Sequence, residues 1–304
     1  MALTFLRQRW KTFTAVVAGS TLLLAAAAIG VIGWVGSQRA IHPGVDEPTH
    51  TLAGFGLEAE DVRFESRDGT TIAAWFVRGE GKQGATVLLL HGYGQSRAEL
   101  LPHAAYLHDD GYNVLLIDFR GCGESGGNGV TLGAHEPLDV MAAIDYLQAR
   151  PEVDQRRIAV QGVSLGASAG IMAAAEDGRI VAVVAKSAFT DVRATVARSF
   201  EYYIGLPAFP FAPVSVFISE RRLGADMDDV RPIDSVARLG TRPVFIIDDL
   251  DDQRIPDRSG EKLYAAASGP KELWLIAGAG HADGFKFEPL AYRAKVLSFL
   301  EAQL

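Results

Sequence analysis

The sequence predicts an α/β domain, in which helices cover both faces of a mostly parallel sheet, preceded by one membrane-spanning helix. Three features predict it. Apolar runs alternate with helical patterns from about residue 85 onward, an alternating hairpin pattern precedes them, and a stretch near the N-terminus is almost free of charge. Strands that alternate with helices favour a parallel sheet, and 304 residues are enough for one large core.

The uncharged stretch, residues 13–35, has 23 residues, which exceeds the roughly 20 that a helix needs to cross a bilayer. Basic residues flank it unequally, three before it and one after it: Arg7, Arg9, Lys11 and Arg39. This bias places residues 1–12 in the cytoplasm and the domain outside it. The alternative is a signal peptide cleaved behind Ala25–Ala28, after which the domain would be secreted.

Charge and cysteine content exclude other classes. Residues 1–41 hold four basic and no acidic residues, so the remainder holds 25 basic and 37 acidic residues. An acidic domain is a poor nucleic-acid binder, and we expect no nucleic-acid partner. The single cysteine, Cys122, excludes an internal disulfide framework and a cysteine-based zinc cluster.

A linker is expected between the membrane helix and the domain. It spans residues 36–60, where His42-Pro43-Gly44 and Asp46-Glu47-Pro48 interrupt regular structure. The domain is then expected to span residues 61–304.

The domain begins with a predicted hairpin, in which Asp68-Gly69 joins two alternating strands. The expected strands are Val62–Ser66, Thr71–Val77, Ala85–Leu90, Tyr112–Ile117, Ile158–Gln161, Ile180–Ala185, Pro243–Ile247 and Glu272–Ile276. The expected helices are 96–110, 133–149, 167–176 and 289–304. Unbroken apolar runs such as Leu88-Leu89-Leu90 are typical of central parallel strands that are covered on both faces.

Residues 188–235 interrupt this alternation with many aromatic residues and prolines. They are Phe189, Phe200, Tyr202, Tyr203, Phe209, Phe211 and Phe217, with Pro207, Pro210 and Pro213 between them. Prolines at this density exclude one long helix. We expect a small helical cap over the C-terminal edge of the sheet, where ligands bind in such sheets.

Gly162-Val163-Ser164-Leu165-Gly166 lies between a predicted strand and a predicted helix, which is the setting of a nucleophile elbow. Small neighbours let the backbones pass each other, and the turn presents the serine hydroxyl at the positive end of a helix. The alternative is a glycine-rich turn with an incidental serine.

Three further loops follow other strands at the same edge. His91-Gly92-Tyr93-Gly94 would let a backbone N–H approach a substrate, Asp248–Pro256 offers carboxylates, and Gly278–Asp283 presents His281. The histidines have a structural alternative as ordinary turn or surface residues. Along the chain, Ser164, Asp252 and His281 nevertheless follow one another in the order nucleophile, acid, base, which is one of the chain orders that a catalytic triad takes.

With these motifs, residues 60–300 resemble the α/β-hydrolase fold superfamily, and within it the serine hydrolases and esterases with a short cap. The stretch from Asp118 to Ser125 also carries the resemblance. The resemblance implies that Ser164 is the nucleophile and His281 the general base and then acid.

The family's acid usually lies four residues before a proline, which selects Asp252 from Pro256. Asp248-Asp249 replace the family's usual His-Gly at the start of this loop, so Asp251 remains an alternative.

The resemblance also implies an oxyanion hole formed by the N–H groups of Leu165 and Tyr93, with the Tyr93 phenol as a possible further donor. Asp118 and Arg120 are expected to form an ion pair that supports their loop. Cys122 is expected to be a bystander, because no neighbour would activate it.

These features predict a membrane-anchored serine hydrolase, a carboxylesterase or lipase-like enzyme that forms an acyl-enzyme. The aromatic cap favours a small-molecule ester or a lipid as substrate. No cofactor and no metal are expected, since the aspartates of residues 248–257 lack the spacing of a calcium loop. The alternatives are a peptidase, amidase or acyltransferase on the same triad, and a non-catalytic binding protein.

Overall fold

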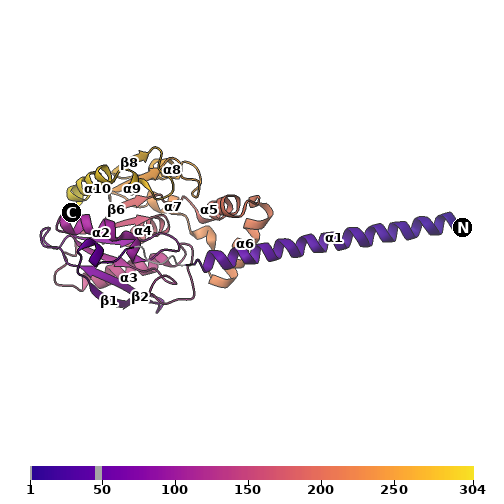
Figure 1. The fold of residues 1–304 in the computed structure, drawn as a ribbon, viewed down its shortest axis with the longest axis horizontal. Coiled ribbons are helices and arrows are strands. Elements are labelled where there is room, and N and C mark those ends of the chain that lie inside the picture. The colour runs from indigo at the N-terminus through magenta and orange to yellow at the C-terminus, as the bar shows by residue number, and fades with distance from the viewer. Residues whose placement is uncertain (1, 45–49) are drawn as a thin grey trace.

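The computed structural model describes residues 2–44 and 50–304, with side chains from residue 7 onward. A 40-residue helix, α1 (Ala2–Ile41), projects from a domain that holds the remaining elements (Figure 1). The expected turn at Asp46-Glu47-Pro48 lies outside the described residues.

An eight-stranded sheet forms the centre of the domain. Its strands are β1 (Glu60–Glu65), β2 (Thr71–Val77), β3 (Thr86–Leu90), β4 (Asn113–Ile117), β5 (Ile158–Val163), β6 (Ile180–Lys186), β7 (Val244–Asp249) and β8 (Lys271–Ile276). They lie in the order β1-β2-β4-β3-β5-β6-β7-β8. The six strands β3 to β8 are parallel to one another, whereas β2 is antiparallel to both of its neighbours, β1 and β4. The predicted parallel sheet with a hairpin at one edge is confirmed.

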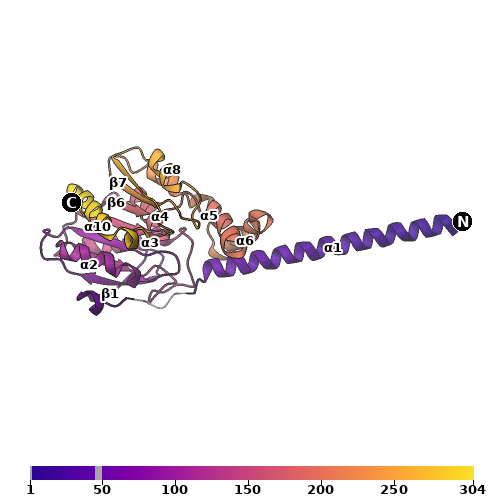
Figure 2. The ribbon, with the colours of Figure 1, turned by 45° about the horizontal axis from the view of Figure 1, so that its top comes forward.

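Helices cover both faces of this sheet (Figure 2). One core lies under α3 (Glu136–Gln148), α4 (Leu165–Glu176), α7 (Pro232–Ala237) and α8 (Ser259–Ala266). The other lies under α2 (Leu101–Asp109) and α10 (Pro289–Gln303). Every residue of β3, β4 and β5 is buried, which explains their unbroken apolar runs. Short turns complete the domain: η1 (Ala53–Phe55), η2 (Arg97–Leu100) and α9 (Gly284–Phe287).

The segment between β6 and β7 forms short helices over the C-terminal edge of the sheet. They are α5 (Val192–Ser199), the π-helical η3 (Phe200–Ile204), α6 (Ala208–Leu223) and η4 (Met227–Asp229). A third apolar cluster lies beneath them and includes Leu165, Phe189, Val216 and Ile255. The residue that follows Ser164 is therefore part of the packing between the cap and the sheet.

The last turns of α1 belong to this domain, because they pack against α6. A Cβ on Gly33 would lie 2.5 Å from Cγ1 of Val214, so only glycine allows this approach. Ser37 is fully buried and accepts a hydrogen bond from Ser219 at 2.9 Å. The helix therefore continues to Ile41, beyond the expected span of residues 13–35 and into the first part of the expected linker.

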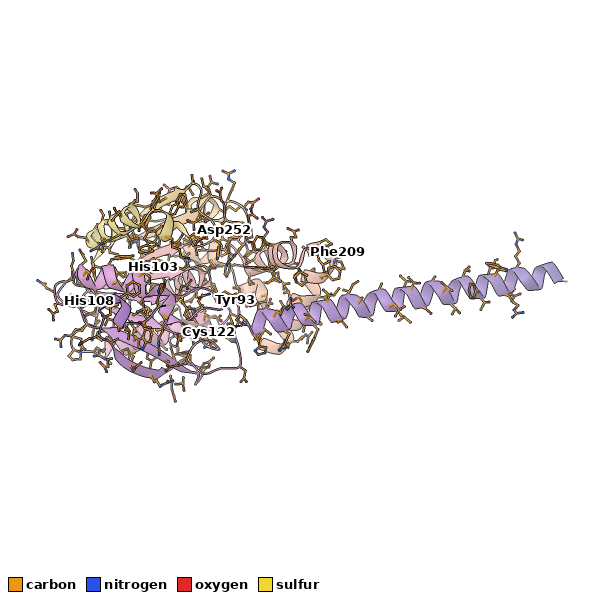
Figure 3. All side chains as sticks on the ribbon, in the orientation of Figure 1. Tyr93, His103, His108, Cys122, Phe209 and Asp252 are labelled. Atoms are coloured by element: carbon orange, nitrogen blue, oxygen red, sulfur yellow. The ribbon has the colours of Figure 1, made fainter. Side chains whose placement is uncertain are left out.

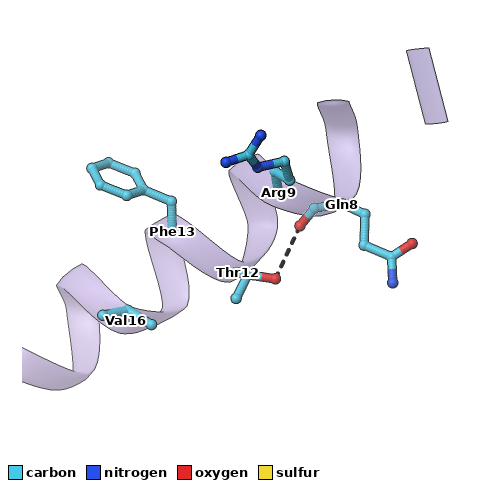
Figure 4. A pocket seen from close by; sticks show the side chains of 5 residues that line it. All are labelled: Gln8, Arg9, Thr12, Phe13 and Val16. Atoms are coloured by element: carbon cyan, nitrogen blue, oxygen red, sulfur yellow. Dashed lines mark hydrogen bonds between the residues drawn. The ribbon is translucent and has the colours of Figure 1, made fainter. Parts of the chain in front are cut away.

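A shallow groove near the other end of α1 is lined by one face of this helix alone (Figure 4). Thr12 Oγ1 donates to the carbonyl oxygen of Gln8 at 3.1 Å within it, and Phe13 and Val16 supply apolar walls. A single helix face with an internally bonded hydroxyl offers little to a ligand, and the groove lies far from the sheet.

Candidate active site

Ser164 occupies the sharp turn between β5 and α4, with φ 53° and ψ −112°. Residues other than glycine rarely adopt a positive φ, and backbone strain of this kind is often found at functional residues. A Cβ on Gly162 would lie 2.4 Å from the backbone carbon of Gly166, and one on Gly166 would lie 2.2 Å from the carbonyl oxygen of Leu90. The turn therefore needs both glycines, and it presents Ser164 at the N-terminus of α4.

The structure brings Ser164, Asp252 and His281 together. Nε2 of His281 lies 3.0 Å from Oγ of Ser164, and its Nδ1 lies 2.6 Å from Oδ2 of Asp252. A charged carboxylate can only accept, so Nδ1 carries the proton and Nε2 is free to accept the proton of the hydroxyl. Ser164 is 8% exposed, and the cap lies over this edge of the sheet.

Asp252 keeps its charge in this position. Burial raises the pKa of Asp252, but the hydrogen bond from His281 and the N–H groups of Arg254 and Ile255 outweigh burial, so that the pKa is lowered. Those N–H groups donate to Oδ1 at 2.8 and 3.2 Å. The alternative acid, Asp251, is exposed, and its N–H donates to the carbonyl oxygen of Ala279 at 3.1 Å.

The loop after β3 lies directly against the serine. A Cβ on Gly92 would come within 3.8 Å of Cβ of Ser164, and the Gly92 N–H donates to Oε2 of Glu99 at 2.7 Å. His91 is buried: its Nε2 accepts the N–H of Phe119 at 2.9 Å, so its Nδ1 donates to the carbonyl oxygen of Gly92 at 2.7 Å. His91 therefore holds the backbone of this turn, which is the structural alternative that the sequence left open for it.

The two predicted oxyanion donors remain available in this geometry. Within residues 2–44 and 50–304, no hydrogen-bond acceptor is found for the N–H of Leu165 or of Tyr93. Leu165 is the first residue of α4, so its N–H lies where the partial positive charge of a helix N-terminus is concentrated. Their role in holding an oxyanion stays a prediction.

The Tyr93 phenol, by contrast, is directed away from the serine. Its hydroxyl lies 2.7 Å from the carbonyl oxygen of Arg39 and 3.0 Å from that of Ala40, at the end of α1 (Figure 3). Burial raises the pKa of Tyr93, so the phenol stays protonated and donates to these carbonyls. The expectation that this hydroxyl adds an oxyanion donor is not supported, because its only proton serves α1.

The expected ion pair between Asp118 and Arg120 is wrong. Arg120 pairs with Asp139 and with Asp68, both at 2.6 Å. Asp118 lies 3.7 Å from Arg97 and accepts the N–H of that arginine at 2.6 Å. Both residues lie beyond the end of β4 at Ile117, and each is held by partners that are distant in sequence.

Cys122 is buried in the apolar cluster under the cap. Burial, with smaller contributions from the carboxylates of Glu136 and Asp118, raises the pKa of Cys122 to about 12. Its thiol is therefore protonated at neutral pH and is a poor nucleophile.

Two supporting interactions escaped the sequence analysis. Glu99 holds the loop after β3, and the spacing of Ser96 and Glu99 is a capping-box pattern that could have singled it out. Lys186 forms a buried ion pair with Asp249 at 2.5 Å, and the N–H of Gly284 also approaches Asp249, at 3.4 Å. This pair joins β6, β7 and the loop that carries His281, which local sequence cannot reveal.

Comparisons with known proteins agree with this architecture. The sequence model of the X-Pro dipeptidyl-peptidase (S15) family matches residues 68–203. Protein YfhR of Salmonella typhi is 33% identical over 258 residues, covering 81% of this chain and 83% of the relative. The α/β-hydrolase domain-containing protein WAV2 of Arabidopsis thaliana is 26% identical over 260 residues, covering 83% of this chain and 81% of the relative. An esterase of Pyrococcus furiosus superimposes with a TM-score of 0.71 at 27% identity, covering 86% of this chain and 98% of that structure.

Proposed function

The chain belongs to the α/β-hydrolase superfamily and is a hydrolase, and we propose that it is a membrane-anchored serine hydrolase that cleaves carboxylic esters. The observation that carries this proposal is that three side chains contact one another in succession, with His281 in the middle. His281 lies 3.0 Å from Ser164 and 2.6 Å from Asp252. A serine hydroxyl in contact with a base, which a carboxylate orients in turn, is the arrangement that activates a weak nucleophile.

In the first half of the reaction, Oγ of Ser164 attacks the ester carbonyl carbon while its proton passes to Nε2 of His281. The imidazolium is stabilised by the charged Asp252. His281 then gives this proton to the alcohol oxygen as the C–O bond breaks, which leaves an acyl group on Ser164. In the second half, water attacks the acyl carbon, His281 takes the water's proton, and Ser164 leaves with that proton restored.

The negative charge on the carbonyl oxygen needs donors that are already in place. The N–H of Leu165 and the N–H of Tyr93 would supply them from two sides of the serine. Glu99 and the neutral His91 hold the loop that bears Tyr93, through the backbone of Gly92. Removing one such donor typically costs about 10²–10³ in rate.

Esters are favoured over peptides as substrates because of the structural likeness to the Pyrococcus furiosus esterase and the apolar cluster beneath the cap. The match to the S15 peptidase family favours a peptidase as the second candidate.

One comparison separates the two candidates. p-Nitrophenyl esters and amino-acyl or Xaa-Pro p-nitroanilides are measured with the same protein, and Ser164→Ala serves as the blank. We expect much higher kcat/KM on the esters, with the ester activity lost in the variant. Higher kcat/KM on the anilides would instead identify a peptidase.

We propose that α1 anchors the protein, with residues 1–12 in the cytoplasm and the hydrolase domain outside it. The mean hydropathy of its most apolar window is 2.3. Three basic residues precede the apolar run and one follows it. Protease added to intact spheroplasts should digest the domain, whereas full protection would contradict this topology. Cleavage of a signal peptide would appear as a shorter protein in the culture medium.

A further inference from the structure

The part of α1 that is exposed all round is shorter than the hydrocarbon core of a bilayer. The residues from Phe13 to Ala28 are exposed except Gly19, whereas Ile29 and Gly30 are half-buried and one face of α1 is buried against the domain from Gly33 onward. These sixteen residues rise about 24 Å, against a hydrocarbon core of about 30 Å. The apolar run continues to Val35, so the missing length lies where α1 is already covered on one side by the cap.

The cap helix that covers it is α6, which runs parallel to α1. Val214 meets Gly33, and Ser219, further along α6, meets Ser37. The backbone of Phe209 is not helical, so the regular part of α6 begins at Pro210. Counted back at ~1.5 Å per residue from the contact of Val214 with Gly33, Pro210 lies beside roughly residue 29 of α1. The cap therefore reaches about 9 Å along the apolar run, counted from Val35 to Ile29.

Exposed aromatic and aliphatic side chains lie in η3 and at the start of α6. We call them the apolar tip: Tyr202 is 44% exposed, Tyr203 61%, Ile204 38% and Phe209 79%. Figure 3 shows Phe209 at the far end of the cap, beside α1 and away from the sheet. Aromatic side chains are favoured in the interfacial region of a bilayer, where their rings lie among the headgroups and the first methylenes.

The apolar tip is continuous with the surroundings of the triad. The Tyr203 ring lies 5.9 Å from the guanidinium of Arg254, and the backbone N–H of Arg254 donates to Asp252. Arg198 of the preceding helix donates to the carbonyl oxygen of Gln253 at 2.9 Å. A molecule that passes over the tip thus reaches the two arginines that adjoin the loop bearing the triad acid.

Charge does not account for such docking, because the domain beyond α1 carries 25 basic and 37 acidic residues. An anionic lipid surface would repel it rather than attract it. Apolar burial beside the anchor is the attraction that remains.

We propose that the apolar tip inserts into the outer leaflet beside α1, and that the enzyme takes its ester from the bilayer rather than from water. The substrate class is an ester whose acyl chain is long enough to partition into lipid. This proposal rests on the proposed anchor and on the proposed hydrolase function.

The depth of the tip can be measured in the full-length protein, because its only cysteine is buried. In a Cys122→Ala background, a fluorescent probe is attached to Phe209→Cys, and the protein is placed in phosphatidylcholine nanodiscs that contain lipids with quenchers at defined depths. Leu22→Cys, 71% exposed on α1, is the positive control. Leu290→Cys, 84% exposed in the first turn of α10 and outside the cap, is the matched negative control.

We expect the probes at Leu22 and Phe209 to be quenched by lipid and the probe at Leu290 to report water. If only the Leu22 probe is quenched, the anchor stands and tip insertion is overturned. If neither is quenched, the anchor is overturned, and tip insertion with it.

A kinetic comparison tests the source of the substrate. Phe209→Ser should lower the ratio of turnover of a long-chain ester in vesicles to turnover of a soluble acetate ester by on the order of tenfold, since a phenyl group no longer leaves water. Leu290→Ser should leave this ratio unchanged. An unchanged ratio in Phe209→Ser overturns supply from the bilayer. A wild type that turns over neither ester overturns the esterase function itself, while the quenching still decides insertion.

Discussion

The hydroxyl of Tyr93 donates a hydrogen bond to the carbonyl oxygen of Arg39 at 2.7 Å. The backbone of this same tyrosine is the proposed second donor to the oxyanion, and Arg39 lies in the last turn of α1. The next loop is tied to the same helix end, because the N–H of Val130 donates to the carbonyl oxygen of Ile41 at 2.8 Å. The end of α1 is thus a supporting part of the catalytic domain and does more than tether it.

Tyr93→Phe should therefore lower kcat about two- to tenfold, since it removes one hydrogen bond of about 0.5–1.5 kcal/mol that positions the loop. The N–H of residue 93 is retained, so KM should change less than kcat. Tyr264→Phe, at a half-buried tyrosine on α8 outside the cap and the site, is the control. Unchanged kcat in Tyr93→Phe would show that α1 does not position this loop.

Asp252→Asn should lower kcat by about 10³–10⁴, because an amide cannot hold His281 in the required tautomer or stabilise the imidazolium. Asp251→Asn, at the exposed neighbour, should leave kcat unchanged. Steady-state kinetics on a p-nitrophenyl ester distinguish the two. A large loss in Asp251→Asn with little loss in Asp252→Asn would reverse the assignment of the acid.

Asp248 should make the folded state less stable at high pH. Burial, together with the charges of Asp252 and Asp249, raises the pKa of Asp248 to about 6 from an ordinary value of 3.8. The folded state then binds this proton more tightly than the unfolded state does, so stability rises as pH falls from above 6 towards 4.

Asp248→Asn should accordingly raise the free energy of unfolding at pH 8 by up to about 3 kcal/mol, the equivalent of about two pKa units. This gain should shrink towards pH 4. Thermal unfolding of the detergent-solubilised protein at both pH values measures it. A gain of equal size at both values would mean that the titration of Asp248 does not contribute.

Gly166→Ala should destabilise the domain by about 1–3 kcal/mol or more, because its Cβ would lie 2.2 Å from the carbonyl oxygen of Leu90 and neither backbone can yield easily. Gly178→Ala is the matched control, since a Cβ there meets no atom within 4 Å. Thermal unfolding of both variants tests this, and equal melting temperatures would show that the elbow is less tightly packed than described.

The fold could be predicted from sequence because its signals are local. Each inner strand is a short apolar run, and each predicted site loop directly follows such a run, so the parallel sheet brings the loops to one edge. The distance from Pro256 favours Asp252 over Asp251, and the structure places Asp252 against His281.

The contacts of α1 could not be predicted because they are made with residues about 180 positions away. Hydropathy shows that α1 is apolar, but the role of Gly33 depends on Val214 and that of Ser37 on Ser219. The spacing of Gly33 and Gly36 is the signal of a packed helix face that the sequence offers. The predicted partner of Arg120 is wrong for a similar reason, because the actual partners, Asp68 and Asp139, are distant in sequence.

The central claim is that Ser164 is the nucleophile, and labelling with a fluorophosphonate probe tests it most directly. Such probes react only with an activated serine. We expect the wild type and Ser20→Ala, a change on the exposed surface of α1, to be labelled equally and Ser164→Ala not to be labelled. Undiminished labelling of Ser164→Ala would contradict the account.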